Sequence, residues 1–583
     1  MGNNKFDFFG KQLIIYSDGK VPAYSDDLTY SSLFKEIFHR YILQLKQKES
    51  SLLKISLKEI NEEQVLFLIQ QLARYQKKFV IQKYPELEAY FSDLYLLNQF
   101  VESLYNYWRG YERFFVCYSD EMLMVRHHER PYSTFNDTVE NLNNLTRKLY
   151  RDICANITNE HPRIYRQVPA GAQVGLIVVE EDISLPFPYT KLEPVNYIKQ
   201  VLIEPPLIID PTNNTRSGEF KKIDKNPLDF ISTLEEHEWI CYPAQVGDLI
   251  IHVFFNNKFI GLGTALSNLF DLATSEQLKQ KPDAIFLFGV PTDVAKNIDS
   301  DSTVFFEDKE NDILVGSIPD GDEFGYFGYL KKMMLTLHNI IMMKRGRLPV
   351  HGAMVKIDLK NNKSANIIIM GDTGAGKSES LEAFRKLGEE YIREMTIIFD
   401  DMGSLSIENG KIKAFGTEMG AFVRLDDLNP GYAFGNIDRS IIMSPQKKNA
   451  RVVLPITTMQ EVLRGQNVDY FLYANNYELV DNTHPVLELF NSSSEAIEIF
   501  RRGRSMSKGT TNLTGVNETY FVNVFGPVQY KEMHNKLAEK YFSALFENKI
   551  KVGQIRTMLG VKGKENSGPE SAAKALLEII MKG

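Results

Sequence analysis

The segment from Gly371 to Ser378, which reads GDTGAGKS, has the residue types and spacing of a phosphate-binding loop. Its glycines let the backbone curl so that several N–H groups converge on one anion. Lys377 adds a mobile positive charge, and the Ser378 hydroxyl can hold a divalent ion that bridges two phosphates. The alternative is an ordinary glycine-rich turn. The residues expected to bind phosphate are Gly371, Asp372, Thr373, Gly374, Ala375, Gly376, Lys377, Ser378 and Glu379.

The elements on either side of this segment support the phosphate-binding interpretation. An apolar run over 367–370 comes before it, and the sequence SESLEAFRKL, typical of a helix, begins at Ser378. Strand, glycine-rich turn and helix N-terminus form a cradle for phosphate oxygens, because the free N–H groups at the start of a helix favour an anion. We therefore expect this protein to handle phosphoryl groups.

A phosphate loop needs a second acidic element to hold a metal ion. The apolar run over 395–399 leads directly into Asp400 and Asp401, 23 residues after Lys377. Carboxylates at the C-terminal end of a strand lie where ligands bind in an α/β sheet. We expect Asp400 and Asp401 to hold a metal ion; the alternative is a solvated turn before Gly403.

Four further candidates are ambiguous when each is taken alone. His351, at the start of an expected strand, is of a type that is more often structural than a ligand. The pair Lys331 and Lys332 usually indicates a solvated helix face. Arg216 lies in a polar turn, NTRSG, and Arg451 follows a charged loop, KKNA, that need have no chemical role.

The order of these segments resembles that of the phosphoenolpyruvate carboxykinases, chiefly the ATP-using branch, over roughly residues 200–545. The family's T-G-R-S-P-K-D-K turn is similar to NTRSGEF, with Arg216, and its Y-A-G-E-M-K-K segment to YFGYLKK, with Tyr326 and Lys332. The family's M-H-C-S-A-N strand resembles VHGAMV, with His351. Its G-D-D resembles Phe399-Asp400-Asp401, its N-T-R-V-S-Y-P-I resembles NARVVLPI, with Arg451, and its F-x-x-E-G-G-C-Y-A-K is echoed by FGTEMGAFVR, with Glu418 and Arg424.

This resemblance implies an α/β (mixed α+β) fold with a two-lobed core that carries the phosphate loop. It implies reversible decarboxylation and phosphorylation of oxaloacetate to phosphoenolpyruvate and CO2, with ATP as donor and Mn2+ and Mg2+ as metals. Lys332, His351 and Asp401 would hold the ion that stabilises the enolate, and Mg2+ would lie on Ser378 and Asp400. The implied roles of the others are a carboxylate grip for Arg216, orientation of CO2 or product for Tyr326, and phosphoryl charge neutralisation for Lys377 and Arg451.

Two departures from the family pattern leave the donor open between ATP, another nucleotide such as GTP, and pyrophosphate. The phosphate loop is closer to that of HPr kinase/phosphorylase, and Asn512 takes the place of an arginine on the adenine side. A kinase of that second type, acting on a protein or small-molecule hydroxyl, is the main alternative function. A non-catalytic scaffold that binds nucleotide through a relic site is a third.

Composition bounds the class of protein. The chain has 583 residues, 43% of them hydrophobic and 24% charged, which is typical of a globular protein with two to four domains. A net charge of −8 argues against a general nucleic-acid binder. Three distant cysteines indicate a reducing compartment, and no secretory signal or 18-residue apolar stretch is apparent, so we expect no membrane span and a cytoplasmic location.

Periodicity suggests three regions. Residues 1–165 carry apolar residues at i, i+3, i+4 spacing and read as a helical N-terminal extension, with Asp137 as a possible N-cap for a helix over 137–157. Residues 166–325 read as strands and turns of a substrate domain. Residues 326–583 begin with a helix over 327–346 and read as the metal- and nucleotide-binding domain. As a hypothesis, the N-terminal helices mediate oligomerisation or contact a protein partner.

Overall fold

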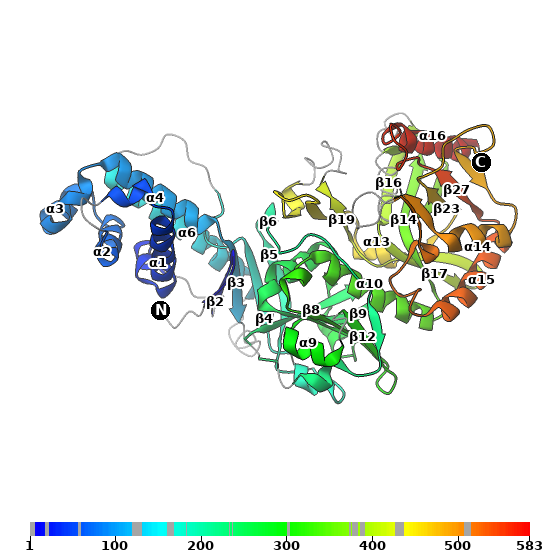
Figure 1. Cartoon of the computed structure of the whole chain (residues 1–583), viewed down its shortest axis with the longest axis horizontal. Helices are drawn as coiled ribbons and strands as arrows, with labels where there is room; N and C mark the ends of the chain where they lie inside the picture. Colours follow the sequence, from blue (N-terminus) through cyan, green and yellow to red (C-terminus); the bar gives the residue numbers. More distant parts are fainter. Residues whose placement is uncertain are drawn as a thin grey trace. The chain divides into compact units, whose positions relative to one another are not determined.

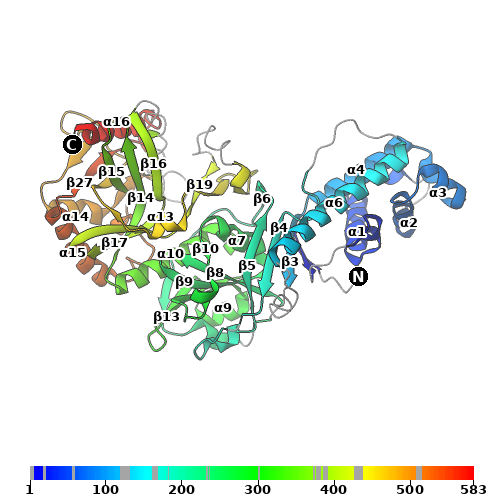
Figure 2. The ribbon, with the colours of Figure 1, turned by 180° about the vertical axis from the view of Figure 1, so that it is seen from behind.

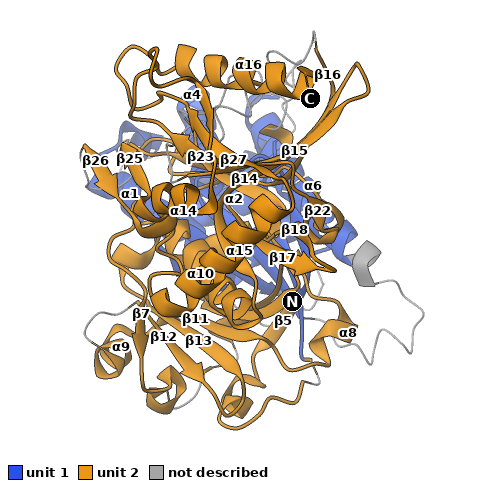
Figure 3. Ribbon diagram, turned by 90° about the vertical axis from the view of Figure 1, so that its right-hand side faces the viewer, with its two compact units in different colours: residues 1–180, 198–207 blue, residues 181–197, 208–583 orange. Residues whose placement is uncertain are grey.

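The computed structural model describes residues 6–17, 22–55, 60–118, 131–159, 168–181, 183–231, 234–235, 237–299, 303–371, 375, 383–384, 391–425, 437–506 and 515–582. The chain divides into two compact units (Figure 3). Unit 1 comprises residues 1–180 and 198–207, and unit 2 comprises residues 181–197 and 208–583. The division passes through strand β5.

Unit 1 combines a small sheet with helices. Its strands run in the order β1-β2-β3-β4-β5, with β2, β3 and β4 parallel. The strands are β1 (Phe6–Phe9), β2 (Gln12–Ser17), β3 (Glu112–Tyr118), β4 (Val174–Val179) and β5 (Asn196–Ile203), and the α-helices are α1 (Ser32–Gln47), α2 (Glu62–Leu72), α3 (Lys77–Lys83), α4 (Leu94–Arg109) and α6 (Pro131–Thr158). Short 3-10 helices cover η1 (Asp26–Tyr30), η2 (Ser51–Ile55) and η3 (Pro85–Phe91).

The helices of unit 1 follow from apolar spacing, as expected, but the region before residue 165 is not helical alone. Buried residues of α1, α2, α4 and α6 form one core, and a second core lies between the sheet and α6. The proposed cap at Asp137 is wrong, because α6 begins at Pro131 and Asp137 lies inside it. Proline is well suited to the first position of a helix, where its missing N–H has no partner to lose.

Unit 2 contains two large sheets. The first runs β5-β8-β9-β11-β13-β12-β7, with β10 paired to β8. Its strands are β7 (Lys221–Ile223), β8 (Trp239–Val246), β9 (Leu249–Asn256), β10 (Asp271–Leu272), β11 (Ala284–Val290), β12 (Val304–Asp308) and β13 (Ile313–Pro319). Near it lie the helices α7 (Ile260–Ala265), α8 (Ser275–Leu278) and α9 (Thr292–Ile298), with the 3-10 helices η4 (Tyr189–Leu192), η5 (Pro227–Phe230), η6 (Asn257–Phe259), η7 (Leu266–Asn268) and η8 (Asp322–Phe324).

The second sheet of unit 2 carries the phosphate-loop segment and runs β22-β18-β17-β14-β15-β23-β27-β24, with β16 paired to β14. Its strands are β14 (Leu348–Leu359), β15 (Ser364–Met370), β16 (Ile392–Phe399), β17 (Met402–Glu408), β18 (Lys411–Gly416), β22 (Gln466–Asn467), β23 (Tyr470–Asn475), β24 (Leu487–Leu489) and β27 (Lys551–Arg556). Helices α14 (Ser493–Arg502) and α15 (Lys531–Glu547) pack on one face and α16 (Ser567–Lys582) on the other (Figure 1).

A smaller sheet in the order β19-β21-β20-β6 carries Arg451 at the start of β21. Its strands are β6 (Leu207–Ile209), β19 (Gly420–Arg424), β20 (Ile441–Met443) and β21 (Arg451–Pro455). The remaining elements are α13 (Met459–Leu463), η10 (Ile437–Arg439), η11 (Tyr520–Val522) and the hairpin of β25 (Arg504–Met506) and β26 (Val516–Glu518).

Helix α10 (Phe327–Lys344) lies between the two large sheets of unit 2 and contacts β8, β11 and β13 of the first and β14 and β17 of the second (Figure 2). Nearly every residue of α10 is buried, which is why its sequence is apolar on all sides. Lys331 of this helix is buried with the apolar residues.

The mixed α/β class expected from the sequence is confirmed, whereas the two-lobed carboxykinase-like core and the boundaries near 165 and 325 stay predictions. Within the described ranges, no helix combines the length and apolar character needed to cross a membrane.

Candidate functional site

Strand register brings His351 and Asp401 together beside the start of the phosphate-loop segment. In β14, His351 pairs with Met402 of β17, and the adjacent Gly352 pairs with Met370 at the end of β15. The Gly352 N–H donates to the carbonyl of Asp401 at 3.0 Å, and the Gly371 N–H donates to the carbonyl of His351 at 3.0 Å. The segment that begins at Gly371 therefore leaves the sheet next to His351.

Two lysines of α10 reach the same carboxylate. The Lys332 ammonium nitrogen lies 2.7 Å from Oδ2 of Asp401, and His351 Nε2 lies 3.1 Å from Oδ1. Lys331 also lies 2.7 Å from Oδ2, although its side chain is only 1% exposed. Side chains of α10 and β14 thus converge on Asp401, which lies just before β17. This arrangement brings together the amine, imidazole and carboxylate groups of Lys332, His351 and Asp401, which the family resemblance implied as one set.

The contact between His351 and the carbonyl of Val522 determines which ring nitrogen carries the proton in a neutral imidazole. Nδ1 lies 2.5 Å from the carbonyl oxygen of Val522, which can only accept, so Nδ1 is the protonated nitrogen. In a neutral imidazole, Nε2 then turns a lone pair toward the carboxylate of Asp401. Two facing lone pairs repel unless a proton or a cation lies between them. A histidine that ligates a metal through one ring nitrogen commonly donates the N–H of its other ring nitrogen to a carbonyl or carboxylate.

The charges around Asp401 set its protonation. Burial alone would raise the pKa of its carboxyl, but the charges of Lys331 and Lys332 hold that pKa well below its usual value, and so does His351, whose Nε2 donates to the carboxylate when the imidazole is protonated. Burial would likewise lower the pKa of Lys331, yet Asp401 and Glu418 raise it above the ordinary lysine value. Asp401 is therefore ionised and Lys331 charged at neutral pH.

Glu418 is a fully buried carboxyl behind this ion pair. Burial raises the pKa of Glu418 to about 8, although Lys331, with Nζ 3.8 Å from Oε1, opposes the shift. The Thr417 hydroxyl contacts both Glu418 Oε2 and, at 3.0 Å, the carbonyl of Met402. A hydroxyl has one proton, so Thr417 donates to the carbonyl and accepts from a protonated Glu418. Glu418 therefore adds little negative charge at neutral pH.

The segment from Thr519 to Gly526 forms one wall of the site. Phe521 and Val522 have φ values of 48° and 47°, a left-handed conformation that is rare for residues with bulky side chains. This conformation directs the Val522 carbonyl to His351. The ring of Phe525 then lies 4.6 Å from the Lys332 nitrogen and 5.2 Å from the Arg216 guanidinium carbon. Backbone strain of this kind is commonly stored at functional sites.

Arg216, Tyr326 and Arg451 form a second group in the site. Burial raises the pKa of the Tyr326 hydroxyl, while the charges of Arg451 and Arg216 and a hydrogen bond from Asn449 oppose the rise. Arg451 is 7% exposed, and its Nε has no hydrogen-bond partner among the described residues. The Asn449 amide donates to the carbonyl of Asn214 at 2.6 Å, which ties the loop before Arg451 to the turn of Arg216.

The described charged groups of the site are in positive excess. Four basic side chains, those of Lys331, Lys332, Arg216 and Arg451, lie with the two carboxylates of Asp400 and Asp401. Asp400 is buried, and its negative charge contributes to the raised pKa of Lys331. An excess of positive charge creates a positive potential, which favours an anionic ligand.

Most of the phosphate loop cannot be placed against these groups. Gly371 and Ala375 are described and buried, and the Ala375 carbonyl accepts from the Thr557 hydroxyl at 2.8 Å. Outside the described residues lie Asp372, Thr373, Gly374, Gly376, Lys377, Ser378, Glu379 and Asn512. Their expected roles in binding phosphate and Mg2+ stay predictions.

Sequence reasoning did not single out Phe525, Val522 or a role for Lys331 apart from Lys332. In the described part of the chain, no group of three or more His, Cys, Asp or Glu side chains is arranged to hold a metal ion. The set at Asp401 has one imidazole, one carboxylate and amines instead.

Comparison with known proteins adds no family to this geometry. No model of a known protein family matches the sequence, and no curated protein matches it.

Proposed function

We propose that this protein is a phosphoenolpyruvate carboxykinase-like enzyme, which converts oxaloacetate to phosphoenolpyruvate and CO2 with ATP or another phosphoryl donor. The observation that carries the proposal is the convergence of Lys332, His351 and Asp401, from α10, β14 and the residues before β17. The GDTGAGKS sequence that follows β15 supports a phosphoryl donor beside them.

The residues at Asp401 fit a divalent cation such as Mn2+. The lone pair on His351 Nε2 and the ionised carboxylate face each other across 3.1 Å, and Lys332 can ligate once it gives up a proton. A cation bound there would supply Lewis-acid stabilisation for negative charge that develops on the substrate. The carbonyl of Val522 would keep the imidazole in the required tautomer.

The other basic groups suit a substrate with two carboxylates. Arg216 offers a planar pair of donors for a carboxylate, and its position over Phe525 limits its rotation. Loss of CO2 breaks one C–C bond and leaves its electron pair in an enolate. The enolate oxygen attacks the terminal phosphorus of the donor, and the bond from that phosphorus to its leaving oxygen breaks. Arg451, buried and with an unpartnered Nε among the described residues, suits the negative charge that forms.

The test is an assay of the purified full chain with oxaloacetate and Mn2+ and, in separate reactions, ATP, GTP or pyrophosphate. We expect phosphoenolpyruvate with at least one donor and a loss of roughly 100-fold or more in Lys332→Ala and in His351→Gln. His338→Gln is the matched control, since His338 is a buried histidine of α10 whose Nδ1 contacts Asn339.

Two results would overturn the proposal. One is the absence of phosphoenolpyruvate with all three donors while the wild-type chain remains folded. The other is transfer of phosphate from ATP to a protein or small-molecule hydroxyl without any use of oxaloacetate, which would favour the HPr kinase-like alternative.

A further inference from the structure

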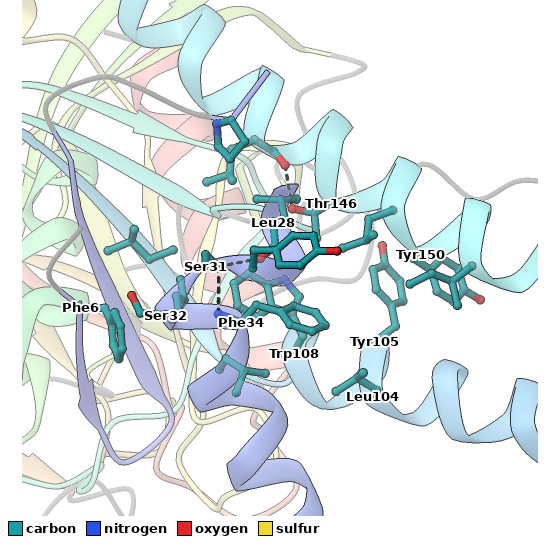
Figure 4. A pocket seen from close by; sticks show the side chains of 18 of the residues that line it. Phe6, Leu28, Ser31, Ser32, Phe34, Leu104, Tyr105, Trp108, Thr146 and Tyr150 are labelled. Atoms are coloured by element: carbon teal, nitrogen blue, oxygen red, sulfur yellow. Dashed lines mark hydrogen bonds between the residues drawn. The ribbon is translucent and has the colours of Figure 1, made fainter. Parts of the chain in front are cut away.

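Unit 1 contains a cavity of about 340 Å³ that has no part in the proposed reaction (Figure 4). Its walls come from η1, α1, α4, α6 and the sheet, where the helical core meets the strand core. The volume lies within the range of small-molecule sites and exceeds that of cavities that hold a benzene molecule. Leu104 and Trp108 line it from α4, and Leu149 lines it from α6.

The described residues of the lining include no side chain that is charged at neutral pH. Among the described residues that line the cavity there is no Asp, Glu, Lys, Arg or His. A charged ligand would lose its hydration without gaining a counter-charge, which is strongly unfavourable. The occupant must therefore be uncharged over the part that enters.

Several polar atoms of the lining are already used within the protein. The Ser31 hydroxyl donates to the carbonyl of Leu28 at 2.7 Å and accepts from the Phe34 N–H at 3.1 Å. The Thr146 hydroxyl donates to the carbonyl of Leu142 at 2.8 Å, and the Trp108 N–H donates to the carbonyl of Ala170. These groups do not need a ligand, so the surface they present is largely apolar.

Aromatic rings supply much of the remaining wall. Tyr105 and Tyr150 stack with ring centroids 4.0 Å apart, and Figure 4 shows Tyr105 and Trp108 on the same helix beside the cavity. Ser32 and Tyr105 also line it, and hydroxyl groups such as theirs can bind a neutral hydroxyl group.

We propose that this cavity binds an uncharged, mainly apolar small molecule, such as a medium-chain alcohol. The walls match a hydrocarbon chain by apolar burial and leave hydroxyls for a single neutral polar group. Because the cavity lies within unit 1 and the proposed reaction in unit 2, the inference does not depend on the proposed function.

The experiment titrates the full chain with 1-octanol and, separately, with octanoate at pH 8, by isothermal calorimetry. These probes share a chain length and differ in charge. We expect octanol to bind at least tenfold more tightly than octanoate. Thr146→Phe, which places a ring in the cavity, should weaken octanol binding at least tenfold. Asn141→Phe is the matched control, because Asn141 is an exposed residue of the same helix that does not line the cavity.

A second measurement locates the binding site. The chain has two tryptophans, and Trp239, which lies in β8 of unit 2, is not among the described residues that line the cavity. 8-Bromo-1-octanol should quench the fluorescence of the wild-type chain, and the quenched component should be missing in Trp108→Phe. The proposal is overturned if octanol fails to bind, if octanoate binds equally well, or if Thr146→Phe leaves octanol binding unchanged.

Discussion

Lys331 and Asp401 form an ion pair with a nitrogen-to-oxygen distance of 2.7 Å, in which the lysine side chain is 1% exposed and the aspartate side chain 16% exposed. The next residue, Lys332, contacts the same oxygen but is 14% exposed. Consecutive lysines therefore differ in surroundings although they share a partner. We infer that Lys331 neutralises and positions the ionised carboxylate of Asp401, and that Lys332 is the lysine available to a bound cation or substrate.

This difference predicts separate effects of two identical substitutions. Lys331→Met should lower the free energy of unfolding by about 2–4 kcal/mol, because it removes one half of a buried pair. Lys332→Met should lower it by about 1 kcal/mol or less, since its ammonium is partly solvated and Lys331 still neutralises Asp401. Urea unfolding followed by circular dichroism measures both. Equal losses would contradict the division of roles, as would full phosphoenolpyruvate formation by Lys332→Met.

The lone pair of His351 Nε2 predicts metal binding that can be measured without any turnover. Titration of the protein with Mn2+, followed by the electron paramagnetic resonance signal of the free ion, should show a site that His351→Gln weakens about tenfold or more. His338→Gln, a change of the same size at another buried histidine, should leave Mn2+ affinity unchanged. Equal Mn2+ affinity in wild type and His351→Gln would place the ion elsewhere.

The ring of Phe525 predicts an effect on substrate affinity. Phe525→Leu keeps most of the apolar volume but removes the aromatic face beside Lys332 and Arg216. Contacts between a cation and a ring contribute about 0.5–2 kcal/mol each, so the KM for oxaloacetate should rise about tenfold. Phe521→Leu is the control, because Phe521 lies in the same segment but packs against Tyr520 and His534. It should lower stability without raising KM.

The sequence predicted strands and helices correctly where runs of apolar residues are buried in the core. The apolar runs over 367–370 and 395–399 lie in β15 and β16, the strand expected at His351 is β14, and the helix expected over 327–346 is α10. These elements position His351, Asp401 and Lys332. The prediction that these three residues act together came from the resemblance of the motif order to that of the phosphoenolpyruvate carboxykinases. The chemistry assigned to the group stays a prediction.

The parts that the sequence did not reveal depend on tertiary contacts. A left-handed conformation at Val522 contradicts the local preference of valine; the N–H of Val522 donates to the carbonyl of Thr519, and its carbonyl accepts from His351. Strand β8 contains Pro243, which argues against an interior strand. Pro243 lies between the residues of β8 that pair with β5 and those that pair with β10, where an N–H is not needed for either pairing.

Glu307 predicts a pH-dependent contribution to the stability of unit 2. It lies in β12 and contacts Lys222 of β7 at 2.7 Å, Lys344 of α10 at 2.6 Å and the hydroxyl of Tyr530 at 2.5 Å. Burial alone would raise the pKa of Glu307, but these partners lower it to about 2. Because the folded pKa lies below the unfolded value, the ionised group stabilises the fold above about pH 4.5, and this stabilisation is lost as pH falls toward about 2.

Glu307→Gln should therefore lower the free energy of unfolding by about 1–3 kcal/mol at pH 7. Comparison of wild type and variant by urea unfolding at pH 7, 5 and 3.5 cancels the titration of all other groups. The difference should be similar at pH 7 and 5 and smaller at pH 3.5, because in the unfolded wild-type chain Glu307 is by then mostly protonated. Glu310→Gln, at a nearby exposed glutamate, should change stability by less than about 0.5 kcal/mol at each pH. A Glu307→Gln difference that is constant from pH 7 to 3.5 would show that the three contacts do not depend on the charge of this carboxylate.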